Sequence, residues 1–262
     1  MLLYSTRAFI TIPVLYLCFG GFLYIAQHHF LYIPNNHPFG DCPNAPTETI
    51  SLELSDWRGY YTPSPESSSD RIVVLYHGNA GNACHRTALI TSLQTHGHAV
   101  LIIEYPGFAD PHTSPTTRTI LETIPHIQHH LRHTEYDHTT VVGESIGSGF
   151  ASYHAATSES PVDLILITPF ARLSDLVQER VLIYPVRWLL QADLTVADWS
   201  QAATSVTIIS AEADQIIPTR HTDRLHAALP ATSTTRHTIP NTDHNSLYTA
   251  PQFHTALRTA LE

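Results

Sequence analysis

The sequence contains no lysine: all 13 basic residues among its 262 are arginine, against 23 aspartate and glutamate residues, so the formal net charge is −10 with histidine neutral. Binding to nucleic acid requires clustered bases that neutralise phosphates, and the chain has no basic run, so we expect no nucleic-acid partner. Charged residues make up only 14% of the chain and hydrophobic residues 43%, which excludes an intrinsically disordered protein and allows a large apolar core.

Cysteine is also scarce. Cys18, Cys42 and Cys84 are too few and too far apart for a disulfide framework or a zinc site. A bridge between Cys42 and Cys84 would require a domain that faces an oxidising compartment. We favour the simpler interpretation, in which these two residues are small, partly buried side chains.

Histidine, in contrast, is abundant, with 19 residues. Four of them lie on one predicted helix and include pairs spaced as metal ligands on a helix can be: His126, His129, His130 and His133. No carboxylate accompanies them at ligand spacing and no H-E-x-x-H motif is present, so a solvated polar face is the favoured interpretation. We therefore expect neither a metal nor an organic cofactor.

The N-terminus carries a long apolar run. Residues 8–26 are 19 residues without a charge, which as a helix would span about 28 Å, close to the thickness of a hydrocarbon core. A cleaved signal peptide is the alternative, but Tyr24-Ile25-Ala26 supplies only one of the two small residues that a cleavage site needs. We predict that residues 1–30 are a retained, single-pass signal anchor and that residues 31–262 form one domain.

The charge around this run sets the expected orientation. Arg7 and the free amine are the nearby positive charges, and both precede the apolar residues. The positive-inside rule then places the N-terminus in the cytoplasm and the domain on the outer, extracytoplasmic side. The sequence does not indicate an oligomeric state.

Downstream of residue 48, short apolar segments alternate with helical patterns. Such alternation is typical of a doubly wound, mostly parallel sheet with helices on both faces. The predicted strands are 48–54, 57–61, 71–76, 99–104, 139–142, 162–168, 205–210 and 235–239. The predicted helices are 84–96, 116–132, 146–156, 220–229 and 250–261. In a sheet of this type we expect the chemistry at the carboxyl ends of the strands.

The strand at 139–142 leads into a G-x-S-x-G motif, Gly143-Glu144-Ser145-Ile146-Gly147, at a strand-to-helix turn. A serine there sits on a sharp turn that exposes its hydroxyl, and the flanking glycines permit close packing of the backbone. The following helix contributes free N–H groups and the positive end of its dipole. We therefore predict that Ser145 is a nucleophile.

A glycine-rich turn, His77-Gly78-Asn79-Ala80-Gly81-Asn82, follows the strand at 71–76. Its backbone can present N–H groups to an oxyanion, and we expect the N–H groups of Asn79 and Ile146 to form that hole. A phosphate-binding turn is the alternative, but neither G-x-G-x-x-G nor G-x-x-x-x-G-K-[ST] is present. His77 is expected to brace the turn and not to act in catalysis.

Two late strands are each followed by a candidate partner for the serine. Asp214 lies in the loop after the strand at 205–210, where a carboxylate can orient an imidazole, and Glu212 is its rival. His244 lies after the final strand, in a loop that leads to the final helix. The chain order Ser145, Asp214, His244 is the triad order of one fold in particular.

Taken together, HGNAGN, EYPGFAD, GESIGSG, AEADQIIP and NTDHNS resemble the α/β-hydrolase superfamily of serine hydrolases. More narrowly, the chain resembles the membrane-anchored α/β-hydrolase-domain proteins that carry one N-terminal helix. The resemblance covers most of residues 48–262. It implies an α/β-hydrolase fold, a triad of Ser145, Asp214 and His244, and a short lid at about 171–200.

The implied activity is hydrolysis of a carboxylic ester or thioester through an acyl-enzyme. An apolar lid beside a membrane anchor indicates a small-molecule or lipid-like ester with a hydrophobic acyl chain. The apolar lid residues either line an acyl pocket or pack on the sheet, and for most of them we favour the sheet: Leu182, Tyr184, Val186, Trp188, Leu189 and Leu190. An acyltransferase with the same triad and a non-catalytic, membrane-anchored scaffold or binding module are the alternatives.

Overall fold

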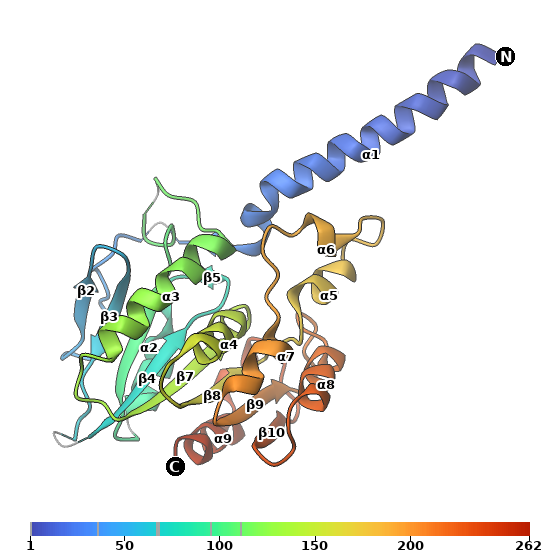
Figure 1. Ribbon diagram of the computed structural model, residues 1–262. Helices are drawn as coiled ribbons and strands as arrows, with labels where there is room; N and C mark the ends of the chain where they lie inside the picture. The colour runs from blue at the N-terminus through green and yellow to red at the C-terminus, as the bar shows by residue number, and fades with distance from the viewer. Residues whose placement is uncertain (1, 36, 67–68, 95, 111) are drawn as a thin grey trace.

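The main sheet of the molecule has one antiparallel edge and an otherwise parallel arrangement (Figure 1). The computed structural model describes residues 2–35, 37–66, 69–94, 96–110 and 112–262, without the side chains of residues 2–10. Within these residues the main sheet has eight strands in the order β10-β9-β8-β7-β4-β6-β3-β2. β3 pairs antiparallel with both β2 and β6, and all other neighbours in the sheet are parallel.

The strand bounds lie close to the predicted ones. β4 and β6 match the prediction residue for residue, and β7 begins one residue earlier and ends two later than predicted. The main sheet consists of β2 (Ile50–Glu53), β3 (Arg58–Thr62), β4 (Arg71–Tyr76), β6 (Ala99–Glu104), β7 (His138–Glu144), β8 (Val162–Ile167), β9 (Ser205–Ala211) and β10 (Thr234–Ile239). A separate parallel pair joins β1 (Ile33–Pro34) to β5 (Ala80–Gly81).

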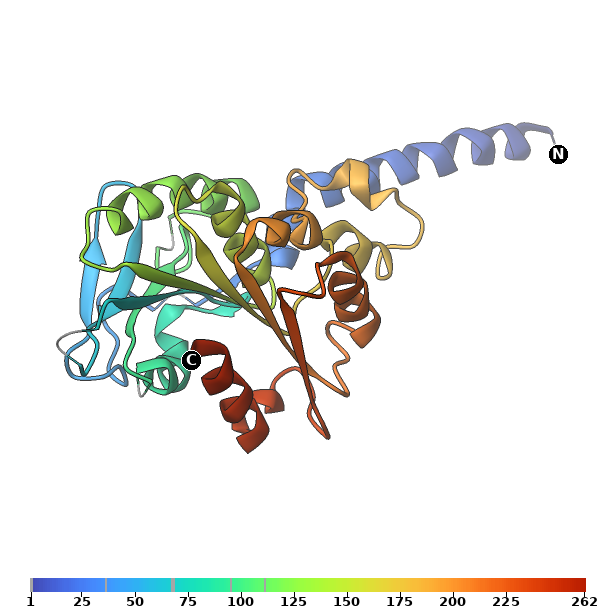
Figure 2. The ribbon, with the colours of Figure 1, turned by 60° about the horizontal axis from the view of Figure 1, so that its bottom comes forward.

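Helices cover both faces of the sheet, because central parallel strands have no solvent-facing side. Every residue of β6 is buried, and so is every residue of β4 except Arg71. One face packs against α3 (Thr117–Leu131), α4 (Gly147–Thr157), α7 (Val196–Trp199) and α8 (Thr219–Ala228). The other packs against α2 (Thr87–Gln94) and α9 (Pro251–Leu261), which lie on the opposite side of the sheet in Figure 2.

Short helices fill the rest of the chain. The segment expected to form a lid contains α5 (Leu173–Gln178), α6 (Val186–Leu189), α7 and the 3-10 turn η2 (Ser200–Ala202). Two further 3-10 turns, η1 (Ala83–Arg86) and η3 (Ser246–Thr249), precede α2 and α9. In both views α5 and α6 lie beside the N-terminal helix, at the carboxyl end of the parallel strands.

The N-terminal helix α1 (Leu2–Leu31) is longer than the predicted apolar run and projects away from the sheet (Figure 1). Its segment Thr11–Leu31 is long and apolar enough to cross a membrane, and only 6% of that segment is buried within the protein. The helix therefore has the length and exposure that the anchor prediction requires. The Arg7 side chain, on which the predicted orientation rests, lies outside the described residues.

Cys42 and Cys84 form a disulfide, with their Cα atoms 5.4 Å apart. The preference for two unbridged side chains was therefore wrong. The bridge forms because the segment after α1 folds back along the glycine-rich turn, where Ile33 pairs with Ala80 and Pro34 with Gly81. This long-range pairing brings Cys42 close to Cys84 in η1. The spacing of the cysteines in the sequence does not predict the pairing.

This bridge makes a measurable contribution to stability. It closes a loop of 42 residues, for which chain entropy predicts a stabilisation of about 4 kcal/mol. We expect the double variant Cys42→Ala/Cys84→Ala to unfold at a clearly lower urea concentration, measured on the full chain in detergent micelles. Cys18→Ala, which removes an exposed free cysteine, is the control and should unfold with the wild type. Equal midpoints for all three proteins would contradict the assignment of the bridge.

Candidate active site

Ser145 occupies a strained turn between β7 and α4. Its backbone φ of +53° lies in the left-handed region, which a residue with a Cβ adopts only where the surrounding structure imposes it. The Ser145 N–H donates to the carbonyl of Ile167 in the neighbouring strand at 2.9 Å. The side chain is therefore held at the carboxyl edge of the sheet, where Ser145 is one of the residues that line a cavity.

Both glycines of the motif are required by close contacts. A Cβ at Gly143 would lie 2.6 Å from the Cα of Ser148, and a Cβ at Gly147 would collide with the carbonyl oxygen of Tyr76. The start of α4 thus crosses directly over the end of β4. This crossing is the reason that the motif needs glycine before and after the serine.

Asp214 and His244 meet at the ends of β9 and β10. The Asp214 Oδ2 and the His244 Nδ1 are 2.7 Å apart, and the Asp214 side chain is only 3% exposed. The other carboxylate oxygen accepts the N–H groups of Ile216 and Ile217 at 2.9 and 2.8 Å. The carboxylate is thereby fixed on one side by the backbone and directs its second oxygen at the imidazole.

The three predicted triad residues follow β7, β9 and β10, at the same edge of the sheet. Among the described residues Ser145 makes no side-chain hydrogen bond to His244, so the structure contains the bent serine turn and the Asp–His pair without a closed Ser–His contact. Unliganded sites often have this contact open, because it tightens only when substrate binds.

Glu212, the rival for Asp214, has a different contact. Its Oε2 accepts the N–H of Asn241 at 2.9 Å. Asn241 itself has a φ of +55°, so this carboxylate stabilises the sharp turn after β10. The geometry therefore separates the two candidates and brings Asp214, not Glu212, to the imidazole.

The two expected oxyanion donors lie beside the serine. Asn79, Ser145 and Ile146 line the same cavity. Within the described residues, neither the Asn79 N–H nor the Ile146 N–H donates to an acceptor, whereas the Asn79 carbonyl accepts the N–H of Ile33 at 2.9 Å. Two free donors beside a nucleophile are the arrangement that an oxyanion hole needs.

His77, the first residue of the glycine-rich turn, is fully buried. One ring nitrogen, Nδ1, lies 2.8 Å from the Gly78 carbonyl, and the His77 carbonyl accepts the Tyr105 hydroxyl at 2.7 Å. Burial lowers the pKa of His77 well below its usual value, so the ring is neutral. It braces the turn, in agreement with the role expected for it.

A buried ion pair behind the serine was not predicted from the sequence. Glu144 accepts the Arg86 guanidinium through both oxygens, at 2.7 and 3.1 Å, and also accepts the Gly78 N–H at 3.3 Å. Burial acts to lower the pKa of Arg86, but the attraction of Glu144 outweighs burial and raises it. The carboxylate therefore ties the residue before Ser145 to the glycine-rich turn at Gly78. Its place inside the G-x-S-x-G motif was the signal that could have identified it.

The cavity beside Ser145 has a volume of about 790 Å³ and is mostly apolar. Val186, Leu189 and Leu190 line it. The preference for packing the predicted lid residues on the sheet was therefore wrong for Val186 and Leu189, whereas Leu190 also packs against the core on one face of the sheet. Tyr184 stacks instead on Tyr16 of α1 at 4.4 Å. Leu182 and Trp188 are 80% and 85% exposed. Residues 182–189 do not pack on the sheet, because this part of the segment projects from the carboxyl edge toward α1 (Figure 1).

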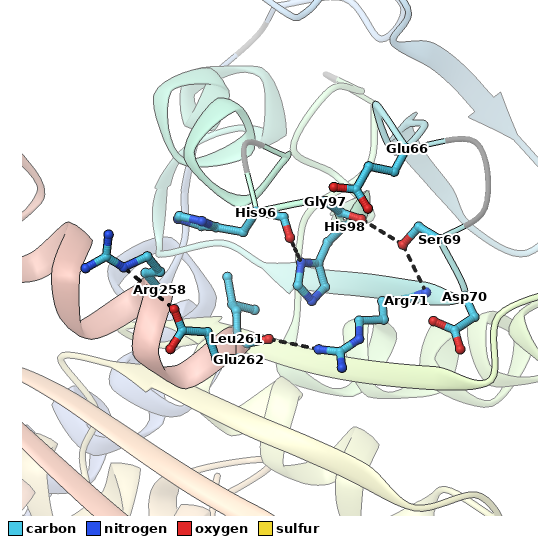
Figure 3. Close-up of a pocket in the computed structure, with 10 residues that line it drawn as sticks. All are labelled: Glu66, Ser69, Asp70, Arg71, His96, Gly97, His98, Arg258, Leu261 and Glu262. Atoms are coloured by element: carbon cyan, nitrogen blue, oxygen red, sulfur yellow. Dashed lines mark hydrogen bonds and ion pairs between the residues drawn. The ribbon is translucent and has the colours of Figure 1, made fainter.

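A second pocket lies at the opposite, amino ends of β4 and β6 (Figure 3). Its volume is about 440 Å³, and its polar groups largely contact one another. Arg71 donates to the Leu261 carbonyl at 3.1 Å, and the Ser69 hydroxyl donates to the Gly97 carbonyl at 2.7 Å. None of the predicted site residues lines it, so it is separate from the candidate active site.

The histidines at the end of α3 and just beyond it contact the backbone and an aromatic ring. The His133 Nδ1 lies 2.7 Å from the His129 carbonyl, and the His130 ring packs edge-on against Trp57 at 5.2 Å. In the described part of the chain, no group of three or more His, Cys, Asp or Glu side chains is arranged to hold a metal ion.

Comparison with known proteins places these features in context. A family model described as the alpha/beta hydrolase fold matches residues 71–188. The uncharacterized protein Rv2307c of Mycobacterium tuberculosis is 25% identical over 261 residues, which cover 94% of this chain and 91% of that protein. The lysophosphatidylserine lipase ABHD12 of Bos taurus is 30% identical over 116 residues, which cover 42% of this chain and 29% of the lipase.

A solved structure has the same architecture. An esterase of Pyrococcus furiosus superposes with a TM-score of 0.64 at 12% identity, over 88% of this chain and 97% of the esterase. At this identity the likeness concerns the fold alone. The predicted fold class, a mostly parallel sheet with helices on both faces, is confirmed.

Glu104, at the end of β6, gives this region a pH-dependent stability. Burial raises the pKa of Glu104 to about 8, and its Oε2 accepts the Ala83 N–H at 3.2 Å. In the folded protein the carboxyl keeps its proton to about pH 8, whereas the unfolded chain releases it near its ordinary pKa. The unfolded state therefore gains stability relative to the folded state as pH rises between these values.

We expect Glu104→Gln, which keeps an acceptor for Ala83, to remove this dependence. Its melting temperature relative to wild type should increase steadily from pH 5 to pH 8 in thermal unfolding. Glu135→Gln, which removes an exposed carboxyl, serves as the control and should give a constant difference across the range. A constant difference for Glu104→Gln as well would show that Glu104 is ionised in the folded protein.

Proposed function

Because the chain is an α/β-hydrolase-fold protein, we propose that it is a serine hydrolase that cleaves an ester or thioester of a hydrophobic acyl group. Ser145 is the nucleophile, His244 the general base and Asp214 the acid of the triad. The single observation that carries the proposal is the 2.7 Å Asp214–His244 contact at the same sheet edge as a serine held at positive φ. The resemblance of the motifs to serine hydrolases supports it.

The reaction uses each of these groups in turn. The Ser145 hydroxyl oxygen attacks the acyl carbonyl while the His244 Nε2 takes its proton. Asp214 holds Nδ1 in its protonated tautomer and stabilises the imidazolium that forms. The tetrahedral intermediate collapses as His244 protonates the departing alcohol or thiol. Water, deprotonated by the same imidazole, then attacks the acyl-enzyme, which releases the acid and restores Ser145.

Charge on the carbonyl oxygen develops during both attacks. The N–H groups of Asn79 and Ile146 are the proposed donors to it, and each is expected to contribute on the order of 10²–10³ in rate. Within the described residues these two N–H groups have no other acceptor, which supports this role. The hydrogen bond that the Gly78 N–H donates to Glu144 supports the turn from behind. No metal or organic cofactor enters this reaction.

The character of the cavity supports a hydrophobic acyl group. Its volume of about 790 Å³ falls within the roughly 300–1,000 Å³ of ordinary ligand sites. Leu173, Leu176 and Val177 of α5 and Ile217 beside the Asp214 loop are among its apolar residues. A lipid-like ester agrees with this lining, and the relative that hydrolyses a lysophospholipid is consistent with it.

We further propose that α1 anchors the chain in a membrane, with the catalytic domain on the outer side. The apolar segment Thr11–Leu31 supports the anchor. The Cys42–Cys84 bridge supports the side, because disulfides persist in oxidising compartments and are rare in the cytosol. This argument is independent of the single charge at Arg7. A lid at about 171–200 and a boundary near residue 30 remain part of the same proposal.

The catalytic proposal predicts which serine reacts with a fluorophosphonate probe. The full chain in detergent should be labelled, and Ser145→Ala should abolish labelling and reduce ester hydrolysis by on the order of 10⁴ or more, since the triad acts as a unit. Asp214→Asn should retain the serine but lose about 10⁴ in kcat.

Ser148→Ala is the matched control, because Ser148 lies in the same motif but is fully buried. It should keep both labelling and activity. A folded wild type that is never labelled and cleaves no ester would overturn the proposal and favour a non-catalytic module.

The topological proposal predicts where the C-terminus lies. A C-terminal alkaline phosphatase fusion, which is active only after export, should be active, and the matching green fluorescent protein fusion should be dark. The chain should stay in the membrane fraction after a carbonate wash. A fluorescent C-terminus with inactive phosphatase would place the domain in the cytoplasm.

A further inference from the structure

The cavity beside Ser145 is bounded by two walls, and one of them is α1. The residues that α1 contributes are Phe19, Phe22, Leu23, Gln27, Phe30 and Leu31. They recur every three or four positions, so they share one face of the helix. The opposite wall comes from α5 and α6. A helix that served only as an anchor would not need one face to line the cavity that contains the nucleophile.

Specific contacts hold α1 against the lid segment. The hydroxyls of Tyr16 and Tyr184 each donate to a carbonyl of the other segment, that of Ile183 at 2.8 Å and that of Tyr16 at 2.7 Å. Eleven residues further on, Gln27 donates to the Leu189 carbonyl at 3.1 Å and accepts the Gln191 N–H at 3.0 Å. These contacts span about three turns of α1, so the helix has a defined register against the lid.

A glycine permits the closest approach between the two. A Cβ at Gly20 would lie 2.9 Å from the Tyr184 ring, so a larger residue there would push the lid away. The end of α1 is also tied to the catalytic machinery. Two residues after the helix ends, the Ile33 N–H donates to the carbonyl of Asn79, a proposed oxyanion residue.

The outer surfaces of both walls are apolar. On α1, Leu15, Leu17 and Ile25 are 63%, 70% and 70% exposed. On the lid segment, Leu182 and Trp188 are more exposed still, and Ile183 is 69% exposed. A patch of this kind beside a candidate membrane span fits the hydrocarbon of the same bilayer. The cavity then opens onto the same hydrocarbon that surrounds α1.

We propose that α1 is half of the acyl-binding site, and that a long-chain lipid ester enters sideways from the bilayer between α1 and the lid segment. The acyl chain lies along Phe19, Phe22 and Leu23, with its carbonyl at Ser145. This inference rests on the proposed function and adds to it the substrate class and the route of entry. It makes α1 a specificity element as well as an anchor.

Two leucines of α1 provide a matched test. Leu23 lines the cavity, whereas Leu17 faces outward and is 70% exposed. Leu23→Trp and Leu17→Trp therefore add the same bulk to the same helix inside and outside the proposed site. Both full-length variants are reconstituted in phosphatidylcholine vesicles and assayed with p-nitrophenyl acetate and p-nitrophenyl palmitate.

We expect Leu23→Trp to lower kcat/KM for the palmitate ester at least tenfold and to leave the acetate ester within twofold of wild type. Leu17→Trp should change neither. If the two variants have the same ratio of palmitate to acetate hydrolysis, α1 is an anchor alone and the inference is wrong. Absence of acetate hydrolysis and of Ser145 labelling in the wild type would instead refute the proposed function, so the two failures are distinguishable.

A second experiment locates the bound acyl chain directly. A fluorophosphonate with a long alkyl chain and a terminal diazirine reacts at Ser145 with loss of fluoride and is then photoactivated in the vesicles. Peptide mapping should find the cross-link in residues 19–31 or in the lid segment 173–190. Cross-links confined to surfaces away from α1 and the lid, or only to solvent, would overturn the proposed path even if the variants of the first test failed to fold.

Discussion

Burial of both faces of the parallel strands is the constraint on which the rest of the molecule depends. Because β4, β6, β7 and β8 run parallel, each connection between them carries the chain from the carboxyl edge back to the amino edge through a helix that packs on a face of the sheet. The carboxyl ends of all these strands therefore open onto one edge. The serine turn, the carboxylate loop and the histidine loop meet there although they are far apart in the sequence.

A layer of buried polar groups supports this edge from below. Glu144 and Arg86 connect the serine strand to the glycine-rich turn through charge-assisted bonds, and the carboxyl of Glu104 accepts from Ala83 at the other end of that turn. Such groups are costly to bury without partners, which gives the turn a defined position. His77, neutral and stacked on Tyr105 at 4.0 Å, lies in this layer with its Nε2 3.8 Å from the Glu104 Oε1. The turn that carries the candidate oxyanion donor Asn79 is therefore held in place by these buried contacts and is not a free loop.

The sequence predicted the sheet well and predicted which residues lie at its carboxyl edge, for a local reason. Short β-branched runs define strands, and the residues just after them lie at the carboxyl edge whatever the details of packing, so Ser145, Asp214 and His244 could be named in advance. The Cys42–Cys84 bridge was considered but not favoured, and the Arg86–Glu144 pair was not predicted, because each depends on how distant segments meet. The lid residues were misjudged for the same reason: apolar character alone does not say whether Val186 or Leu189 faces a sheet, a cavity or another helix.

Removal of α1 would affect the candidate site as well as the proposed anchor. The helix contacts the lid through Tyr16 and Gln27, continues into the β1–β5 pair beside Asn79, and is followed by the bridge to Cys84. A domain without α1 would keep the bent serine turn and the Asp214–His244 contact, since neither involves the helix. It would lose one wall of the cavity and leave Tyr184 without its stacking partner. Under the proposed function, such a fragment would hydrolyse short esters through the triad alone and would lack the chain-length preference that we propose for the intact protein. The N-terminal helix and the domain that follows it, separable in the sequence, together line the cavity beside Ser145.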